Sequence, residues 1–302
     1  MGKWMDGYLD KLSKLNEESL LGGGKERIDV QHSLGKLTAR ERIDRLADPG
    51  SFEELGSLVR NPYARMIENP KPDPGDGVVM GLAKINGRPV MVYAFDFTVM
   101  SGTLGDQGAW KVAELVQMAG QEQLPLIGMI DSAGSRIGFK GGFTGLDGIG
   151  RLVRNYCLYS GIIPQITMLL GPCTGPLAQI PALSDVLIMN SETSFLWLGG
   201  EIKSEEAGKA DFHMEKSGQC DLIAESDEAA IDMAKQVLDF VPQNCWEKPI
   251  AIEPTDDPER GDEALLDVMP EDDRFTYDMH EVIELIVDNG EFFELKEDFA
   301  PN

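Results

Sequence analysis

The sequence predicts an α/β domain built around a parallel β-sheet. Residues 126–131 and 163–170 are apolar runs of the length of a buried strand, and small residues follow each run. Residues 108–122 carry apolar positions at helical spacing and lie between the β-rich run 89–95 and the first apolar strand. A helix between two such strands indicates a right-handed β–α–β unit, in which the strands run parallel.

Local signals predict the elements around this core. Asn86 and Gly87 join two β-rich runs and are a strong hairpin signal. Thr38 and Glu41 have the spacing of a capping box, which predicts a helix that ends near Leu46. Helices are further expected over residues 4–20, 148–160, 228–240 and 277–289, strands over 78–85, 185–189, 193–197 and 292–295, and an acidic, proline-bearing linker over 254–270.

Composition narrows the class of protein. The chain has 302 residues, of which 42% are hydrophobic and 26% charged, as is ordinary for a soluble globular protein. We expect no membrane span and a cytoplasmic location, because no segment is long and apolar enough to cross a bilayer and the polar start is no secretory signal. A net charge of −25 argues against nucleic-acid binding.

The sequence also lacks the common catalytic and metal-binding motifs. The four cysteines form no C-x-x-C pair, so neither a zinc ribbon nor a disulfide framework is expected, and we expect no metal. There is no P-loop, no H-E-x-x-H, no G-x-S-x-G and no complete dinucleotide fingerprint. The chemistry therefore has to come from something other than an obvious nucleophile or metal cluster.

The small residues that follow the two buried strands offer such a source. Residues 132–135 are Ser-Ala-Gly-Ser, and residues 171–175 are Gly-Pro-Cys-Thr-Gly. Loops of this kind expose backbone N–H groups at the carboxyl edge of a parallel sheet, where open α/β sheets bind ligands. Two neighbouring loops can each direct an amide at one oxygen, which is how an oxyanion hole is built from backbone alone.

These segments resemble the motifs of one protein family. Residues 131–137, Asp-Ser-Ala-Gly-Ser-Arg-Ile, are similar to the D-S-G-G-A-R-I motif of biotin-dependent acyl-CoA carboxyltransferases, a branch of the crotonase superfamily. Residues 171–175 resemble the family's G-P-C-A-G, and residues 96–105 its D-F-T-V-x-G-G-S-L-G. Residues 27–42 resemble its R-I-x-x-Q-H-x-x-G-K-L-T-A-R-E-R almost letter for letter.

The resemblance implies a crotonase-like ββα superhelix. It divides the chain into an N-terminal helical extension (1–24), one crotonase-like acyl-CoA-binding domain (25–253), and an acidic linker with the start of a second domain (254–302). The implied protein is the N-terminal part of a carboxyltransferase β-type subunit of the propionyl-, methylmalonyl- or acetyl-CoA type.

The implied activity moves a carboxyl group between biotin, carried on a separate protein, and the α-carbon of an acyl-CoA through a thioester enolate. The implied partners are an acyl-CoA, a biotin carboxyl carrier protein and a second crotonase-like carboxyltransferase subunit, within an oligomer. Two alternatives stay open: a biotin-independent crotonase-type decarboxylase, hydratase or isomerase, and a non-catalytic scaffold subunit. The acyl group and the direction of the reaction also stay open.

The resemblance assigns the oxyanion donors to named residues. The amide of Ser135, next to Gly134, matches one donor of the family. At the position of the family's second glycine stands Pro176, which has no N–H, so the second donor is expected to be Gly175 or Leu177, or a water in its place. Pro176 could equally be the first residue of the following helix.

The resemblance also implies the CoA contacts. Lys36, Arg40 and Arg42 lie near a helix start that suits an anion, and the family places this region near the CoA nucleotide. The alternative is that these cations only pair with neighbouring carboxylates. His213 is expected to flank the active site, although a solvent-facing histidine is equally possible. The remaining expected CoA-ester contacts are Ala133, Arg136, Lys140 and Thr174.

Overall fold

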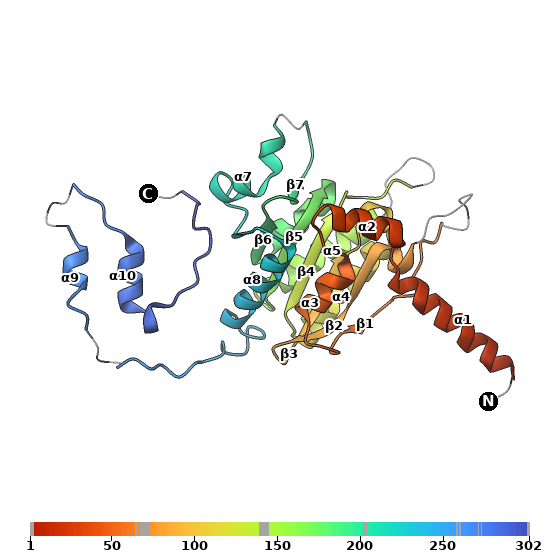
Figure 1. The fold of residues 1–302 in the computed structure, drawn as a ribbon, viewed down its shortest axis with the longest axis horizontal. Coiled ribbons are helices and arrows are strands. Elements are labelled where there is room, and N and C mark those ends of the chain that lie inside the picture. Colours follow the sequence, from red (N-terminus) through yellow and green to blue (C-terminus); the bar gives the residue numbers. More distant parts are fainter. Residues whose placement is uncertain are drawn as a thin grey trace.

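The computed structural model of the chain describes residues 3–63, 66, 73–138, 145–201, 204–257, 259, 261–270, 272 and 274–300. Within them one eight-stranded sheet has the order β1-β2-β3-β4-β5-β6-β8, and β7 pairs with the end of β5 (Figure 1). The first three strands are antiparallel, and every pairing from β3 onward is parallel. The strands are β1 Glu53–Glu54, β2 Val78–Ile85, β3 Arg88–Phe95, β4 Leu126–Ser132, β5 Gln165–Thr174, β6 Val186–Asn190, β7 Phe195–Trp197 and β8 Leu222–Ala224.

Helices cover both faces of the sheet, because its central strands are apolar on both sides. Along β4, Ile127 and Met129 pack on the face covered by α3 and α8, whereas Leu126 and Ile130 pack on the face covered by α4 and α5. The α-helices are α1 Lys3–Leu20, α2 Lys25–Ser33, α3 Ala39–Leu46, α4 Asp106–Glu122, α5 Leu146–Tyr159, α6 Gln179–Leu183, α7 Ala210–Glu215, α8 Asp227–Phe240, α9 Leu265–Val268 and α10 Met279–Ile286; the 3₁₀ turns are η2 Pro74–Gly77, η3 Met100–Gly102, η4 Gly175–Ala178, η5 Glu205–Gly208 and η6 Asp288–Gly290.

The strongest local signals are confirmed. Strands β2 and β3 form the hairpin around Asn86 and Gly87. Helix α3 begins after Thr38, whose N–H donates to the Glu41 carboxylate at 2.8 Å, while its hydroxyl accepts from the Glu41 N–H at 3.3 Å. None of the described helices is both long enough and apolar enough to cross a membrane.

Three expectations differ from the structure. Strand β5 continues to Thr174 instead of ending at 170, because its last residues pair with β7. A short helix, α9, lies inside the expected linker. Residues 292–295 form no strand; the Phe293 ring instead stacks on Phe240 with 5.6 Å between centroids.

The C-terminal segment leaves the body, carries α9 and α10 away from the sheet, and returns to it (Figure 1). On its return the Lys296 N–H donates to the Asp221 carbonyl at 2.9 Å, and the Lys296 ammonium pairs with the Asp221 carboxylate at 2.8 Å. Helix α10 has no buried residue. The fold therefore consists of one layered body with helix α1 and this returning segment attached to it.

Candidate active site

The two small-residue loops lie side by side at the carboxyl ends of the parallel strands β4 and β5. The Thr174 hydroxyl donates to the Ala133 carbonyl at 2.9 Å and so joins one loop to the other. A Cβ added to Gly134, whose φ is +100°, would lie 2.7 Å from the Thr174 carbonyl oxygen. Only glycine permits both this conformation and this approach.

The first loop is held on three sides and leaves one amide unused. The Ala133 N–H donates to the Ser101 carbonyl, the Leu104 N–H to the Gly134 carbonyl, and the Arg136 N–H to the Leu104 carbonyl, at 2.9 to 3.0 Å. Among the described residues the Ser135 N–H has no hydrogen-bond partner, and neither has the shielded Ser135 hydroxyl. The amide expected as an oxyanion donor is thus available.

The structure favours neither Gly175 nor Leu177 as the other donor. The pairing of Thr174 with Trp197 across β5 and β7 directs the Gly175 N–H at the Trp197 carbonyl, because Pro172 has no N–H and the N–H groups of Cys173 and Gly175 therefore face β7. In the 3₁₀ turn η4 the third residue's N–H bonds to the carbonyl three residues before it, which occupies the amide of Leu177. Pro176, the second residue of the turn, loses no hydrogen bond there.

A buried cluster of ion pairs lies directly below the first loop. The Asp131 carboxylate accepts from the Lys36 ammonium at 2.6 Å, and the Arg42 guanidinium lies 3.0 Å from it. Arg42 also pairs with Asp227 at 2.8 Å. Asp131, Arg42 and Asp227 have no exposed surface. Gln31 completes the shell of Asp131 with a hydrogen bond of 3.0 Å.

Two glycines make room for this cluster. A Cβ on Gly171 would lie 1.9 Å from Asp131 Oδ1 and 2.7 Å from Lys36 Nζ. A Cβ on Gly102 would lie 2.1 Å from the Asp131 carbonyl oxygen. Asp131 is therefore fixed through both its side chain and its backbone, one residue before the loop begins.

Arg136 fixes the other end of the same loop. Its guanidinium pairs with the buried Asp76 carboxylate and donates to the Thr103 carbonyl at 2.7 Å. Asp76 also accepts from the Gly108 N–H at 2.8 Å. The segment from Asp131 to Arg136 is thus held on one side by the N-terminal region and on the other by the start of α4.

These contacts bear on the expected CoA-binding cations. Arg42 is fully buried and Lys36 is 5% exposed, and both pair with buried carboxylates, which is the alternative given for them. Their contact with the CoA nucleotide stays a prediction. Arg40 makes a two-pronged pair with Glu54 at 2.7 and 2.9 Å. Arg136 is 8% exposed, and its guanidinium holds the first loop in place through Asp76 and the Thr103 carbonyl. Lys140 lies outside the described residues.

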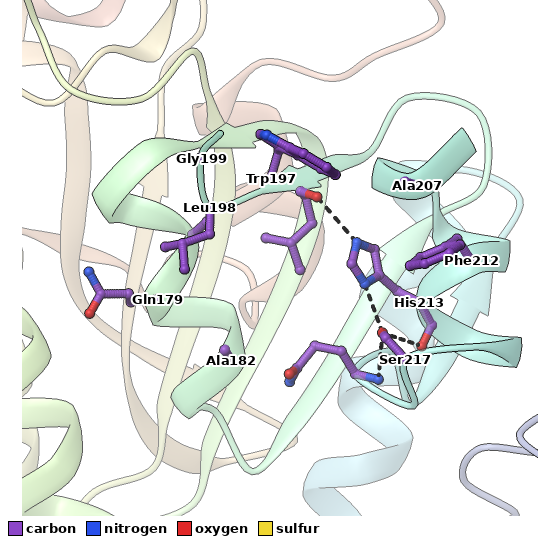
Figure 2. Close-up of a pocket in the computed structure, with 12 residues that line it drawn as sticks. Gln179, Ala182, Trp197, Leu198, Gly199, Ala207, Phe212, His213 and Ser217 are labelled. Atoms are coloured by element: carbon purple, nitrogen blue, oxygen red, sulfur yellow. Dashed lines mark hydrogen bonds between the residues drawn. The ribbon is translucent and has the colours of Figure 1, made fainter. Parts of the chain in front are cut away.

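A pocket of about 420 Å³ opens beside the second loop (Figure 2). His213 stands at its edge: its Nε2–H donates to the Leu196 carbonyl at 3.2 Å, and its Nδ1 accepts from the Ser217 hydroxyl at 2.9 Å. Burial lowers the pKa of His213, which keeps the ring neutral. The lining residues are Ala178, Gln179, Ala182, Leu196, Trp197, Leu198, Gly199, Ala207, Phe212, His213, Ser217 and Gln219.

The site contains no candidate metal centre: no three His, Cys, Asp or Glu side chains of the described residues gather to hold an ion. What it offers, in the part of the chain that the structure describes, is the unpaired Ser135 amide beside a second small-residue loop, next to a pocket with no charged lining residue. Such a pair of loops on a layered sheet of this topology defines the class of crotonase-like domains.

Comparison with known proteins gives the family. The profile of the carboxyl transferase domain matches residues 30–302, and the chain belongs to this family of biotin-dependent acyl-CoA carboxyltransferases. The chain is 38% identical to the propionyl-CoA carboxylase carboxyltransferase subunit of Haloferax mediterranei, over 99% of this chain and 59% of that protein. It is 36% identical to the methylmalonyl-CoA decarboxylase subunit alpha of Veillonella parvula, over 97% and 58%.

Solved structures agree. A transcarboxylase 12S structure with methylmalonyl-CoA and methylmalonic acid bound superposes with a TM-score of 0.91 at 35% identity, over 99% of this chain and 60% of that one. The chain therefore has the crotonase-like fold and spans about three fifths of the length of the relatives it matches.

Sequence reasoning missed the residues that support the site. Asp131 is the first residue of the motif 131–137 and nothing in the sequence marks Asp227, yet these two carboxylates are the buried partners of Lys36 and Arg42. The sequence contains one signal for such pairing. In an acidic chain, three cations within residues 36–42 predict that carboxylates lie close to them in the fold. Nothing in the sequence indicated which carboxylates these would be.

Proposed function

We propose that this chain is the acyl-CoA-binding part of a biotin-dependent carboxyltransferase. The observation that carries the proposal is the unused Ser135 amide, held beside the second loop by the contact between Thr174 and Ala133. The family membership supplies the substrate class, and the names of the relatives point to propionyl-CoA and methylmalonyl-CoA chemistry.

In the proposed mechanism the thioester oxygen accepts one hydrogen bond from the Ser135 amide and a second one from the neighbouring second loop. Negative charge gathers on this oxygen when the α-carbon gives up a proton. Carboxybiotin on its carrier protein would supply the carboxyl group that this carbon takes up, and the biotin nitrogen released from that carboxyl group would receive the proton. The reverse step passes through the same enolate. Each fixed donor contributes roughly 3 kcal/mol to its stabilisation.

Calorimetry of the purified chain tests the proposal. Propionyl-CoA is expected to bind, and free CoA to bind more weakly, because only the ester has a thioester oxygen for these hydrogen bonds. Desulfo-CoA is a suitable control, since it keeps the nucleotide and lacks the thiol. A correctly folded chain that binds none of several acyl-CoAs would contradict the proposal.

We further propose that the biotin side of the reaction is supplied by partner proteins that bind at an exposed apolar surface of this chain. A biotin carboxyl carrier protein and a second crotonase-like subunit are the expected partners. Helix α10 exposes apolar side chains, among them Met279, which is 51% exposed, and Ile286, which is 64% exposed. Exposed apolar surface of this kind marks protein–protein interfaces.

Co-expression with candidate second subunits tests this partnership. A defined hetero-oligomer with carboxyl transfer or decarboxylation activity is expected, together with no turnover by the purified single chain. Full activity of the single chain without biotin would refute the partnership and favour a biotin-independent crotonase-type enzyme.

A further inference from the structure

The pocket in Figure 2 is continuous with the second loop of the proposed oxyanion hole. Ala178 lines the pocket and belongs to η4, the same 3₁₀ turn that begins at Gly175. On its other side the pocket is lined by Trp197, which stands in register with Thr174 across β5 and β7. An acyl-CoA bound at the Ser135 amide, which the contact between Thr174 and Ala133 holds beside the second loop, can extend its acyl carbons towards this pocket.

The chemistry of the lining favours an apolar ligand. None of its twelve residues carries a carboxylate, an ammonium or a guanidinium. Trp197, Leu198 and Phe212 supply large apolar surfaces, and Figure 2 shows them around the pocket with Ala182 and Gln179 at its other wall.

The polar groups at the edge are already satisfied. His213 uses both ring nitrogens, on Leu196 and on Ser217, and the Ser217 hydroxyl also accepts from the Gln219 N–H at 3.3 Å. A charged ligand group placed here would lose its hydration and gain no oppositely charged partner, only the neutral amides of Gln179 and Gln219, which costs several kcal/mol. Burial also lowers the pKa of His213, so the ring supplies no positive charge near neutral pH.

We propose that this pocket binds the acyl chain of the CoA ester and selects uncharged aliphatic chains of butyryl length or longer. The inference rests on the proposed function and names its substrate class. At about 420 Å³ the pocket has the size of a small-molecule site, far more than the methyl group of an acetyl ester fills. Unfilled apolar space favours the longer chain, since each methylene that leaves water for the pocket strengthens binding about fourfold.

Calorimetry with acetyl-, butyryl- and hexanoyl-CoA on the full chain tests this inference. Each added methylene is expected to lower the Kd about fourfold until the pocket is full. Ala182 lines the pocket on the exposed side of α6, and Ala182→Leu places a larger side chain in the space that a long acyl chain would occupy. The variant is therefore expected to lose its preference for hexanoyl-CoA, so that the ratio of the acetyl-CoA Kd to the hexanoyl-CoA Kd falls towards one. Ala264→Leu, an equal change beside α9, is the matched control and keeps the wild-type ratio.

The outcomes separate this inference from the function it rests on. Equal affinities for the three esters would overturn the acyl pocket and leave the carboxyltransferase proposal standing. A chain-length dependence that Ala182→Leu does not change would place the acyl group elsewhere and also overturn it. Failure of every ester to bind would overturn the proposed function itself.

Discussion

Asp131→Asn is expected to lower the free energy of unfolding by about 3–5 kcal/mol, although the two side chains have nearly the same shape. The change removes one negative charge from a cluster in which Asp131 and Asp227 balance Lys36 and Arg42, and it leaves the two cations sharing one carboxylate away from water. Burial already lowers the pKa of Lys36, and Asp131 is the main group that opposes this shift.

Urea unfolding measures the effect, with Asp232→Asn as the matched control. Asp232 pairs with Arg45 at 3.1 Å, but the two side chains are 53% and 49% exposed. An exposed pair contributes at most about 1 kcal/mol, so the control should change little. Equal losses in the two variants would mean that the buried cluster is not what stabilises this region.

Ser135→Pro is expected to lower turnover of the assembled enzyme by about a hundredfold or more, because proline deletes the N–H that the proposed mechanism uses. No hydrogen bond within the protein is lost, since that N–H has no partner among the described residues. Ser135→Ala keeps the amide and is expected to be mild.

Two measurements keep the Ser135 experiment decisive. The urea midpoint of both variants shows whether proline disturbs the loop, and the affinity for acyl-CoA shows whether the ligand still binds. A loss of turnover with retained stability and binding is the signature of a missing donor. Equal loss of turnover in Ser135→Pro and Ser135→Ala would instead assign the chemistry to the hydroxyl.

The sequence predicted those parts of the fold that short-range signals determine. The hairpin at Asn86 and Gly87, the capped helix after Thr38 and the two buried central strands all depend on residues a few positions apart. The end of β5 could not be predicted in this way, because the strand continues only where β7 lies beside it.

The site was predictable in its backbone and not in its ion pairs. The small residues of the two loops indicated free amides, and the Ser135 amide has no partner in the part of the chain that the structure describes. The ion pairs of Lys36 and Arg42 join positions separated by 95 and 185 residues, and no periodic pattern encodes such a pairing. Near a helix start, free cations and paired cations look the same in sequence.

The sequence separation within the buried cluster sets an order for folding during synthesis. During synthesis Arg42 is made early, Asp131 midway and Asp227 late. The Leu37 N–H donates to the Asp227 carboxylate at 3.0 Å, so this hydrogen bond also forms late. A nascent chain that has not yet released α8 from the ribosome can pair β3 with β4, but it holds Arg42 with only half of its counter-charge. The ion-pair cluster below the first loop is therefore complete only when about three quarters of this chain has emerged, since closing such distant contacts is the slow part of folding.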